Sequence, residues 1–282
     1  MIGRKGATRR VEVLRPEGGA LEGARDELAV EEPLEIRISW TDAHGARTTE
    51  TVSVTMRTPG DDFELVAGFL FAEGIVDDRR ALDDLTYCSG PDEQAYNVVE
   101  ARLRTGAAVD PSRYRRNFYA SSSCGVCGKA SLEAAEAHGC RVLRPGGIRL
   151  ASTLVPELPE RLEEAQGTFR RTGGLHAAGL FTATGERTVV REDVGRHNAV
   201  DKAVGHALLR GEIPAGERAL VVSGRASFEI VQKAVRAGIP AVVAVGAPST
   251  LAVDLARRFG QTLVGFARDG RFNVYAGPER IA

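Results

Sequence analysis

The chain has 282 residues, a formal net charge of -1 and 43% hydrophobic residues. This composition is typical of a globular protein with room for one large domain or two modest ones. The near-neutral charge gives no reason to expect nucleic acid as a partner. We find neither a run of about eighteen apolar residues nor the apolar core of a signal peptide, so we expect no membrane span. Four cysteines in a chain of this length do not indicate a disulfide framework, so we expect the reducing cytoplasm.

The N-terminal part predicts a polar tail followed by a small α+β domain. Residues 1–27 are charged and glycine-rich, and we expect a loosely held tail that adds at most an edge strand near Val11–Leu14. Alternating apolar residues then predict strands, and a helix opens at Thr58-Pro59 with acids in its first turn. The expected elements are strands over 34–40, 52–56 and 96–103 and a helix over 58–74. We place this domain at residues 28–112.

The remainder, residues 113–282, alternates between short apolar strands and amphipathic helices. Continuous apolar strands indicate a sheet that is covered on both faces, so we expect a largely parallel sheet in a three-layer α/β/α domain. The expected strands are 175–182, 188–191, 219–222, 241–245, 262–266 and 272–275, and the expected helices are 129–137, 197–209, 228–237 and 249–259.

Polar, glycine-rich joints follow three of these strands. They are Glu192–Lys202, Ser223–Ser227 and Gly246–Thr250. Ligands of such sheets bind beyond the carboxyl ends of the strands, where helix N-termini, serines and arginines suit phosphate groups. Each residue also has an ordinary structural interpretation: acids at a helix start, a packed histidine, a helix-entry serine or a surface arginine. Their joint density favours one binding site over these separate roles.

Two cysteines, Cys124 and Cys127, lie three positions apart in the serine- and glycine-rich stretch Ser121–Gly128. A helix starting after them would favour thiolate over thiol. A thiolate can attack sulfur, carry a persulfide, form a disulfide or ligate zinc. A zinc site needs four ligands, so the remaining ones would come from Cys88, Cys140 or His176. The position in a mid-chain loop argues against a thioredoxin-like centre, and the deaminase pattern with His-x-Glu and Pro-Cys-x-x-Cys is not matched.

The chain resembles the FdhD family, the sulfur carrier proteins required for formate dehydrogenase activity. The resemblance starts at about residue 28 and continues to the end, and the block beginning Glu-Asp-Val-Gly-Arg-His-Asn is its most specific part. The matching stretches are Met56–Leu65, Gly68–Leu70, Glu73–Ile75, Ser121–Gly128, Thr172–His176, Glu192–Lys202, Ser223–Arg225, Ala237–Pro240, Ala247–Ser249 and Thr262–Arg268. The polar tail matches no motif of the family.

The resemblance implies a fold, a function and partners. The fold would be a cytidine deaminase-like α/β/α domain with a smaller N-terminal α+β domain, and the protein would form a homodimer. It would be a sulfurtransferase that takes persulfide sulfur from a cysteine desulfurase. The acceptor would be the molybdenum bis(molybdopterin guanine dinucleotide) cofactor destined for the formate dehydrogenase apoenzyme. The alternative is a non-catalytic escort of that cofactor, whose Cys-x-x-Cys is a structural zinc or redox pair.

The resemblance also implies roles for individual residues. Cys124 would carry the persulfide and Cys127 would assist it, and we expect no permanently bound metal. The residues expected to contact the guanine dinucleotide are Phe266, Ala267, Arg268, Asp269, Gly270 and Arg271. The residues expected in further cofactor loops are Asp193, His197, Ser223 and Arg225.

Overall fold

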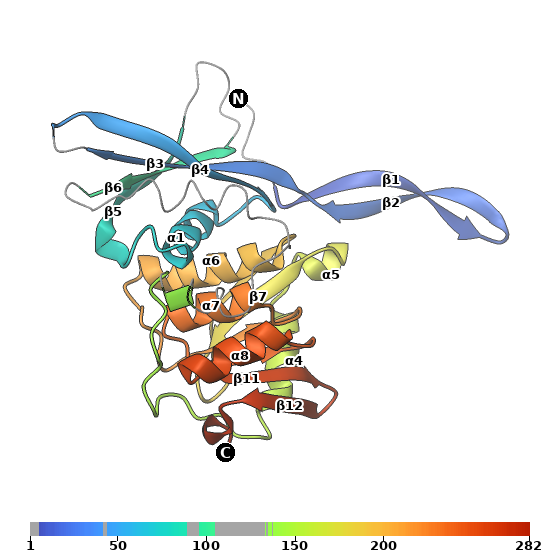
Figure 1. Ribbon diagram of the computed structural model, residues 1–282. Helices are drawn as coiled ribbons and strands as arrows, with labels where there is room; N and C mark the ends of the chain where they lie inside the picture. Colours follow the sequence, from blue (N-terminus) through green and yellow to red (C-terminus); the bar gives the residue numbers. More distant parts are fainter. Residues whose placement is uncertain (1–5, 42–43, 89–95, 105–132, 134, 137) are drawn as a thin grey trace.

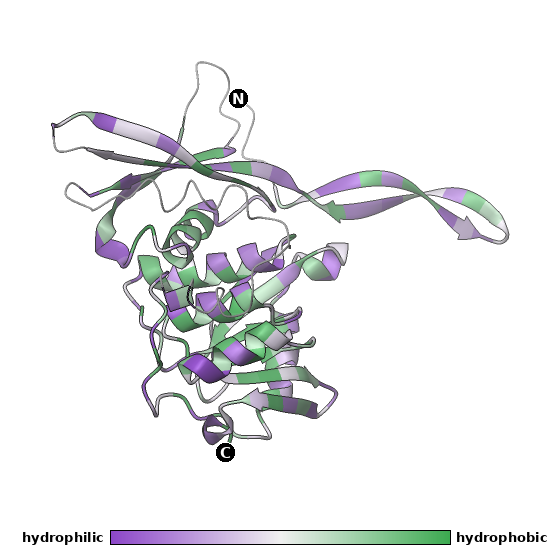
Figure 2. Cartoon of the chain, in the orientation of Figure 1, coloured by the Kyte–Doolittle hydropathy of each residue, from purple (hydrophilic) through white to green (hydrophobic). Residues whose placement is uncertain are grey.

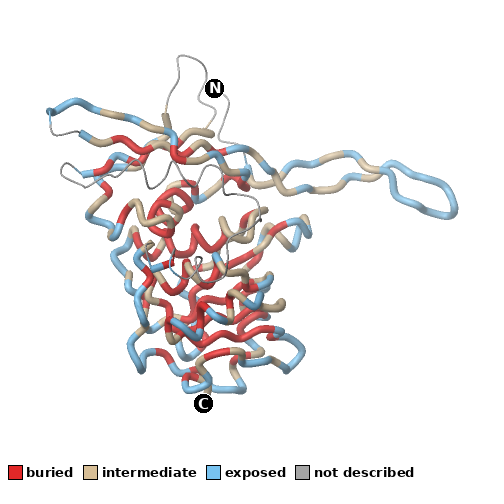
Figure 3. Tube along the Cα trace, viewed as in Figure 1, coloured by how far each residue is buried: buried red, intermediate tan, exposed pale blue. Residues whose placement is uncertain are grey.

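The computed structural model describes residues 6–41, 44–88, 96–104, 133, 135–136 and 138–282. It is a mixed α/β structure with three sheets, and a long hairpin projects from the side of a compact body (Figure 1). Most buried residues lie in that body, whereas the hairpin has none (Figure 3). The expected mixed α/β class is therefore confirmed.

The projecting hairpin replaces the loose tail that the sequence predicts. Strands β1 (Thr8–Glu17) and β2 (Ala20–Ala29) pair antiparallel along their whole length, and Gly18 and Gly19 form the turn with φ of 58° and 91°. Opposite charges face each other across the strands, as in Arg10↔Glu27 and Glu12↔Arg25. These charge pairs stand where apolar alternation would be expected, so hydrophobic periodicity gives no strand signal. Figure 2 shows hydrophilic and hydrophobic residues mixed along both strands of the hairpin.

The second sheet has four strands in the order β4-β3-β6-β5, with helix α1 packed against it. Its elements are β3 (Glu32–Thr41), β4 (Arg47–Arg57), α1 (Asp62–Ala72), the 3-10 turn η1 (Arg79–Ala81), β5 (Leu82–Tyr87) and β6 (Val98–Leu103). The sequence predicts all of these except η1 and β5. Strand β5 is an edge strand whose Asp83 and Asp84 are exposed, so it lacks the alternation that marks a half-buried strand.

The third sheet has six strands in the order β12-β11-β10-β9-β7-β8. The strands are β7 (His176–Phe181), β8 (Arg187–Asp193), β9 (Ala219–Val222), β10 (Ala241–Ala244), β11 (Thr262–Arg268) and β12 (Arg271–Ala276). The expectation of a largely parallel sheet is wrong. The pairings of β9 with β10 and of β10 with β11 are parallel, and the other three of the five pairings are antiparallel. Short hairpin turns join β7 to β8 and β11 to β12, which forces these pairs to be antiparallel.

Helices cover both faces of this sheet. One face carries α6 (Arg196–Leu209), α7 (Phe228–Arg236) and α8 (Thr250–Phe259), and the other carries η3 (Val155–Glu157) and α4 (Leu158–Glu164). Alternate strand residues enter two separate apolar clusters: Leu220 and Val222 join one, whereas Ala219 and Val221 join the other. Two short helical turns, α5 (Phe169–Thr172) and η4 (Pro278–Arg280), complete the fold.

The assignment to a cytidine deaminase-like fold and the domain limits 28–112 and 113–282 stay predictions. The expected boundary and most of the expected helix over 129–137 lie outside the described residues. One apolar cluster contains residues from both sheets and from α1 and α6, so the two parts share a core.

Helices α1 and α6 approach closely because glycines face the partner backbone. A methyl group on Gly68 of α1 would overlap the backbone carbonyl of Asp201, and one on Gly205 of α6 would overlap the carbonyl of Glu64. This contact brings the turn before α1 against the carboxyl end of β8, where the candidate site lies.

Gly68→Ala is expected to lower the free energy of unfolding by about 3 kcal/mol, because the added methyl group has no space between the two helices. Gly167→Ala serves as the matched control, since no described residue lies within 4 Å of its Cβ position. Urea unfolding followed by circular dichroism measures both variants. A Gly68 variant as stable as the control would show that the helices are not packed this closely.

Candidate functional site

Strand directions bring the predicted loops to one edge of the six-stranded sheet. Strands β8 and β9 are both antiparallel to β7, so they run in the same direction as each other and as β10 and β11. The loops after these four strands therefore meet at a common edge, as the sequence predicts. His176, the first residue of β7, pairs with Asp193 and lies at the same edge.

Asp193 is the centre of this edge, and its side chain has no exposed surface. Its carboxylate lies 2.7 Å from the Lys202 ammonium and accepts hydrogen bonds from the backbone N–H groups of Thr58 and Gly195 and from the Asn198 amide. Both oxygen atoms of the carboxylate are therefore bound by groups of the protein itself. We infer that Asp193 positions the loop that follows β8. Its expected contact with the cofactor stays a prediction.

The same loop connects the two parts of the protein. Lys202 donates to the carbonyl oxygens of Thr58 and Glu192, and Asn198 donates to that of Met56. The Glu192 carboxylate accepts the N–H groups of residues 168 and 169 at the start of α5. The block Glu192–Lys202 therefore joins β8, α5 and α6 to the turn before α1, which gives its unusual composition a structural cause.

His197, in the first turn of α6, faces the first turn of α7. Its Nε2 atom lies 3.0 Å from the Ser227 hydroxyl and 3.6 Å from the Glu229 carboxylate. The neighbouring His197 ring is the main cause that lowers the pKa of Glu229 to about 2. His197 is 38% exposed, so the same ring remains accessible at the sheet edge.

The loops after β9 and β10 hold each other in place. Backbone hydrogen bonds link Gly246 to Gly224, Ala226 to Ala247 and Ser249 to Ala226. Ser223 accepts the Ala177 N–H at 2.9 Å, so part of its hydroxyl is used inside the protein. Arg225 is exposed and no ion pair is found for it among the described residues. Of these predicted site residues, Arg225 is therefore the freer one to meet a ligand.

His176 and Arg196 also lie at this edge. A Cβ atom on Gly224 would lie 3.5 Å from His176 Nδ1 and 3.8 Å from Arg196 Cδ, so the three residues are neighbours. Burial first, and then Arg196 and His197, lower the pKa of His176. The Nε atom of Arg196 is buried, and the part of the chain that the structure describes gives it no hydrogen-bond partner. Only the pairing of β7 with β8 reveals this cluster.

The turn between β11 and β12 carries the predicted guanine contacts. Phe266 has a φ of 54°, a strained value for a bulky residue, while its N–H bonds to the Gly246 carbonyl and its side chain is 40% exposed. Arg268 and Arg271 are exposed partners across the hairpin, and Asp269 and Gly270 form its tip with positive φ. Ala267 is fully buried, so neither its side chain nor its backbone has exposed surface. Its expected contact with a ligand stays a prediction.

The two cysteines predicted to act, Cys124 and Cys127, lie outside the described residues. Cys140 is 5% exposed and its burial raises its pKa to about 12, and burial also raises the pKa of Cys88. Within the described ranges, no three His, Cys, Asp or Glu residues are grouped in a way that could hold a metal ion. Cys88, Cys140 and His176, which the sequence offers as zinc ligands, therefore do not form such a group of three by themselves.

The described helices include none that is both long and apolar enough to cross a bilayer.

The class defined so far is a mixed α/β protein whose polar loops, exposed aromatic ring and arginines meet at one sheet edge. A family model described as the FdhD/NarQ family matches residues 29–282. The chain therefore belongs to the FdhD/NarQ family.

Curated relatives match over almost the whole chain. The sulfur carrier protein FdhD of Streptomyces coelicolor is 49% identical over 279 residues, covering 98% of this chain and 96% of that protein. The proteins of the same name from Streptomyces avermitilis and Nocardia farcinica are 50% and 48% identical, with 98% and 100% of this chain covered and 96% of each relative. The relatives thus include the N-terminal region that precedes the family match.

A crystal structure of a formate dehydrogenase accessory protein from Desulfotalea psychrophila has the same fold. The TM-score is 0.73, with 98% of this chain and 100% of that chain covered, at 24% sequence identity. The likeness at this identity concerns the arrangement of helices and strands.

Asp193→Asn is expected to lower the free energy of unfolding by about 3 kcal/mol, because it leaves the Lys202 ammonium buried without its counter-charge. The double variant Asp193→Asn/Lys202→Met removes the unpaired charge and should recover part of that loss. Urea titrations of the single and double variants measure both effects. Equal losses in the two variants would contradict a stabilising ion pair at this position.

His197→Ala is expected to raise the pKa of Glu229 from about 2 towards its ordinary value of 4.5. The lowered pKa means that Glu229 stabilises the folded protein fully above pH 4.5 and loses that contribution as the pH falls towards about 2. Carbon-13 NMR titration of the Glu229 carboxyl group measures the pKa, and Glu229→Gln is the assignment control. An unchanged pKa in the alanine variant would show that His197 is not its cause.

Proposed function

We propose that this protein is a cytoplasmic, homodimeric sulfurtransferase that carries sulfur on Cys124. It accepts persulfide sulfur from a cysteine desulfurase and transfers it to the molybdenum bis(molybdopterin guanine dinucleotide) cofactor for the formate dehydrogenase apoenzyme. The main support is the family match, because residues 29–282 include both cysteines and every loop at the sheet edge. The names of the relatives, which are sulfur carrier proteins, agree with it.

The first step is a thiol exchange without net redox change. The Cys124 thiolate attacks the outer sulfur of the donor persulfide, a new sulfur–sulfur bond forms on Cys124, and the donor cysteine leaves as a thiolate. In the second step the sulfur–sulfur bond of the Cys124 persulfide breaks and Cys124 leaves as a thiolate. The cofactor, as the substrate, accepts the outer sulfur at its metal, whose reduced state would supply the two electrons that form a sulfide ligand. Cys127, three positions away, is close enough in sequence to assist either transfer.

The remaining thiols are poor competitors for this chemistry. Nucleophilic attack needs a thiolate, and burial raises the pKa of both Cys140 and Cys88. Cys140 is also nearly inaccessible. These observations favour Cys124 and Cys127 as the thiols that carry sulfur.

The sheet edge is suited to the cofactor's dinucleotide part. The exposed ring of Phe266 can stack on a guanine base, and Arg268 and Arg271 beside it can pair with phosphate groups. The N-termini of α6, α7 and α8 start at the same edge, and backbone N–H groups there favour anions. Further polar groups at this sheet edge come from His197, Ser223 and Arg225.

Cys124→Ser is expected to abolish uptake of sulfur from a cysteine desulfurase supplied with cysteine, because serine cannot hold a sulfur–sulfur bond. Intact-protein mass spectrometry, with peptide mapping, should detect one added sulfur atom on the protein of natural sequence. Cys88→Ser/Cys140→Ala is the matched control and should load normally. Loading of the Cys124 variant to the normal level would overturn the assignment, and stoichiometric zinc lost on mutation of either Cys124 or Cys127 would favour the escort function.

Phe266→Ala is expected to weaken GDP binding by about tenfold or more, since stacking of a base on an aromatic ring contributes about 1–3 kcal/mol. Isothermal titration calorimetry measures the affinity. Val274→Ala is the control, because Val274 is a comparably exposed apolar residue on the adjacent strand at 38% exposure. Equal GDP affinities for all three proteins would remove Phe266 from the binding site.

A further inference from the structure

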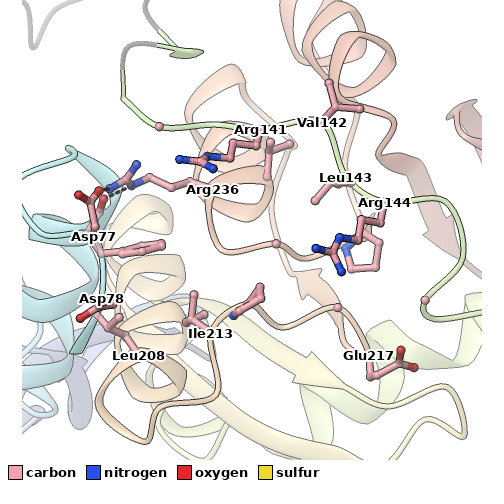
Figure 4. Close-up of a pocket in the computed structure, with 18 of the residues that line it drawn as sticks. Asp77, Asp78, Arg141, Val142, Leu143, Arg144, Leu208, Ile213, Glu217 and Arg236 are labelled. Carbon is pink, nitrogen blue, oxygen red and sulfur yellow. Dashed lines mark hydrogen bonds and ion pairs between the residues drawn. The ribbon is translucent and has the colours of Figure 1, made fainter. Parts of the chain in front are cut away.

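A second concave site lies at the opposite edge of the six-stranded sheet. It is a groove of about 1200 Å³ bordered by residues 77–80 after α1, by residues 139–147 and by residues 211–217 before β9 (Figure 4). Gly216 and Pro240, which precede β9 and β10, line it, so it faces away from the loops that follow these strands. The predicted cofactor residues contribute nothing to this groove.

Two buried arginines hold the walls of the groove in place. Arg236, with a side chain 4% exposed, donates to the carbonyl oxygens of Phe71, Val76 and His138 and pairs with Asp77. Arg280 donates to the carbonyl oxygens of Arg144 and Gly146. Because these backbone segments are fixed, the groove exists before any partner binds, and binding does not require it to be ordered.

The groove has an excess of positive charge that is available to a partner. Its lining includes five arginines and three acidic residues. One acid, Asp77, is paired with Arg236, and Asp78 is paired with Arg80. The side chains of Arg141 and Arg144 are exposed and extend into the groove, and the described part of the chain supplies neither with an ion-pair partner (Figure 4). An acidic partner would supply the missing counter-charges.

Apolar side chains lie between these charges. Val142 is 69% exposed between Arg141 and Arg144, and Leu143 and Pro145 continue the same wall. The facing wall contains Ile213 together with Pro214. A charged rim around an apolar strip is the surface that a peptide segment with acidic and apolar side chains would bury, whereas a small anion would use only the arginines.

The groove lies beside the two points where the segment containing Cys124 joins the described fold. On one side, the N–H of Arg104 bonds to the carbonyl of Ala81, directly after the groove residues Arg79 and Arg80. On the other side, His138 contacts Gln232 of α7 and is followed by Gly139 of the groove. A protein seated in the groove would therefore lie next to both anchors of the segment that carries the cysteine.

We propose that this groove docks the sulfur donor through an acidic segment of the donor that carries an apolar anchor residue. Arg141 and Arg144 pair with its carboxylates, and Val142 packs against its apolar side chain. This inference rests on the proposed function, because it names the surface at which the donor of that function binds. The partner is a protein with a persulfide-bearing cysteine, so the probe is a purified cysteine desulfurase.

The test compares variants of the full-length protein by biolayer interferometry on the immobilised desulfurase and by mass spectrometry of sulfur loading. Arg141→Glu/Arg144→Glu should weaken binding by about tenfold or more and should remove most of its salt dependence. Val142→Asp, at an exposed position that folding tolerates, should weaken binding as well. Loading by inorganic polysulfide, which needs no docking, should stay normal in both variants.

Two controls distinguish a failure of the groove assignment from a failure of the proposed function. Arg9→Glu/Arg10→Glu makes the same charge change on exposed residues of β1 and should bind normally. Cys124→Ala should bind the desulfurase normally but take up no sulfur. If the groove variants bind and load like the unmodified protein, the groove assignment is overturned and the sulfur carrier function stands. If the unmodified protein takes up no sulfur from the desulfurase, the proposed function is overturned, and the groove assignment with it.

Discussion

The buried ion pair between Asp193 and Lys202 is the interaction on which the sheet edge depends. Two charges inside a protein are stable only if hydrogen bonds satisfy the rest of their polar atoms. Here those hydrogen bonds come from Thr58 and Glu192, so the ion pair also fixes the turn before α1 against the end of β8. The close approach of α1 and α6 at Gly68 and Gly205 supports the same junction. The N-terminal part of the chain thereby determines where the loops of the six-stranded sheet lie.

This arrangement explains why some residues of the family's most specific block are inaccessible. Asp193 and Lys202 hold the loop, whereas His197 in the same block and Arg225 in the next loop retain exposed surface. A scaffold made of buried charges allows the exposed groups to be placed accurately without being part of a hydrophobic core. The groove at the other edge is organised in a similar way, since Arg236 and Arg280 use their guanidinium groups to hold backbone carbonyls. Arg141 and Arg144 have no ion-pair partner among the described residues.

Local periodicity was sufficient to predict most of the elements of the body, because apolar strands such as 219–222 and 241–244 and the amphipathic α7 and α8 carry their signals within a few residues. Strand direction carries no such signal, and the sheet proved to be mixed. The gathering of loops at one edge was predictable from strand ends. The role of Asp193 was not, because its partner Thr58 is 135 positions away in sequence. The groove likewise combines three segments that only the folded chain brings together.

The hairpin β1–β2 has a consequence for the solubility of the protein. A two-stranded ribbon that projects from the body exposes unpaired backbone groups along both outer edges, and such edges can recruit strands from other molecules. Exposed Leu14 and Leu21 near its tip would strengthen this tendency. The closely spaced arginines and glutamates along both strands oppose it, because an incoming strand would have to desolvate those charges. The charged residues that remove the alternating apolar pattern from these strands are therefore also the residues that oppose aggregation.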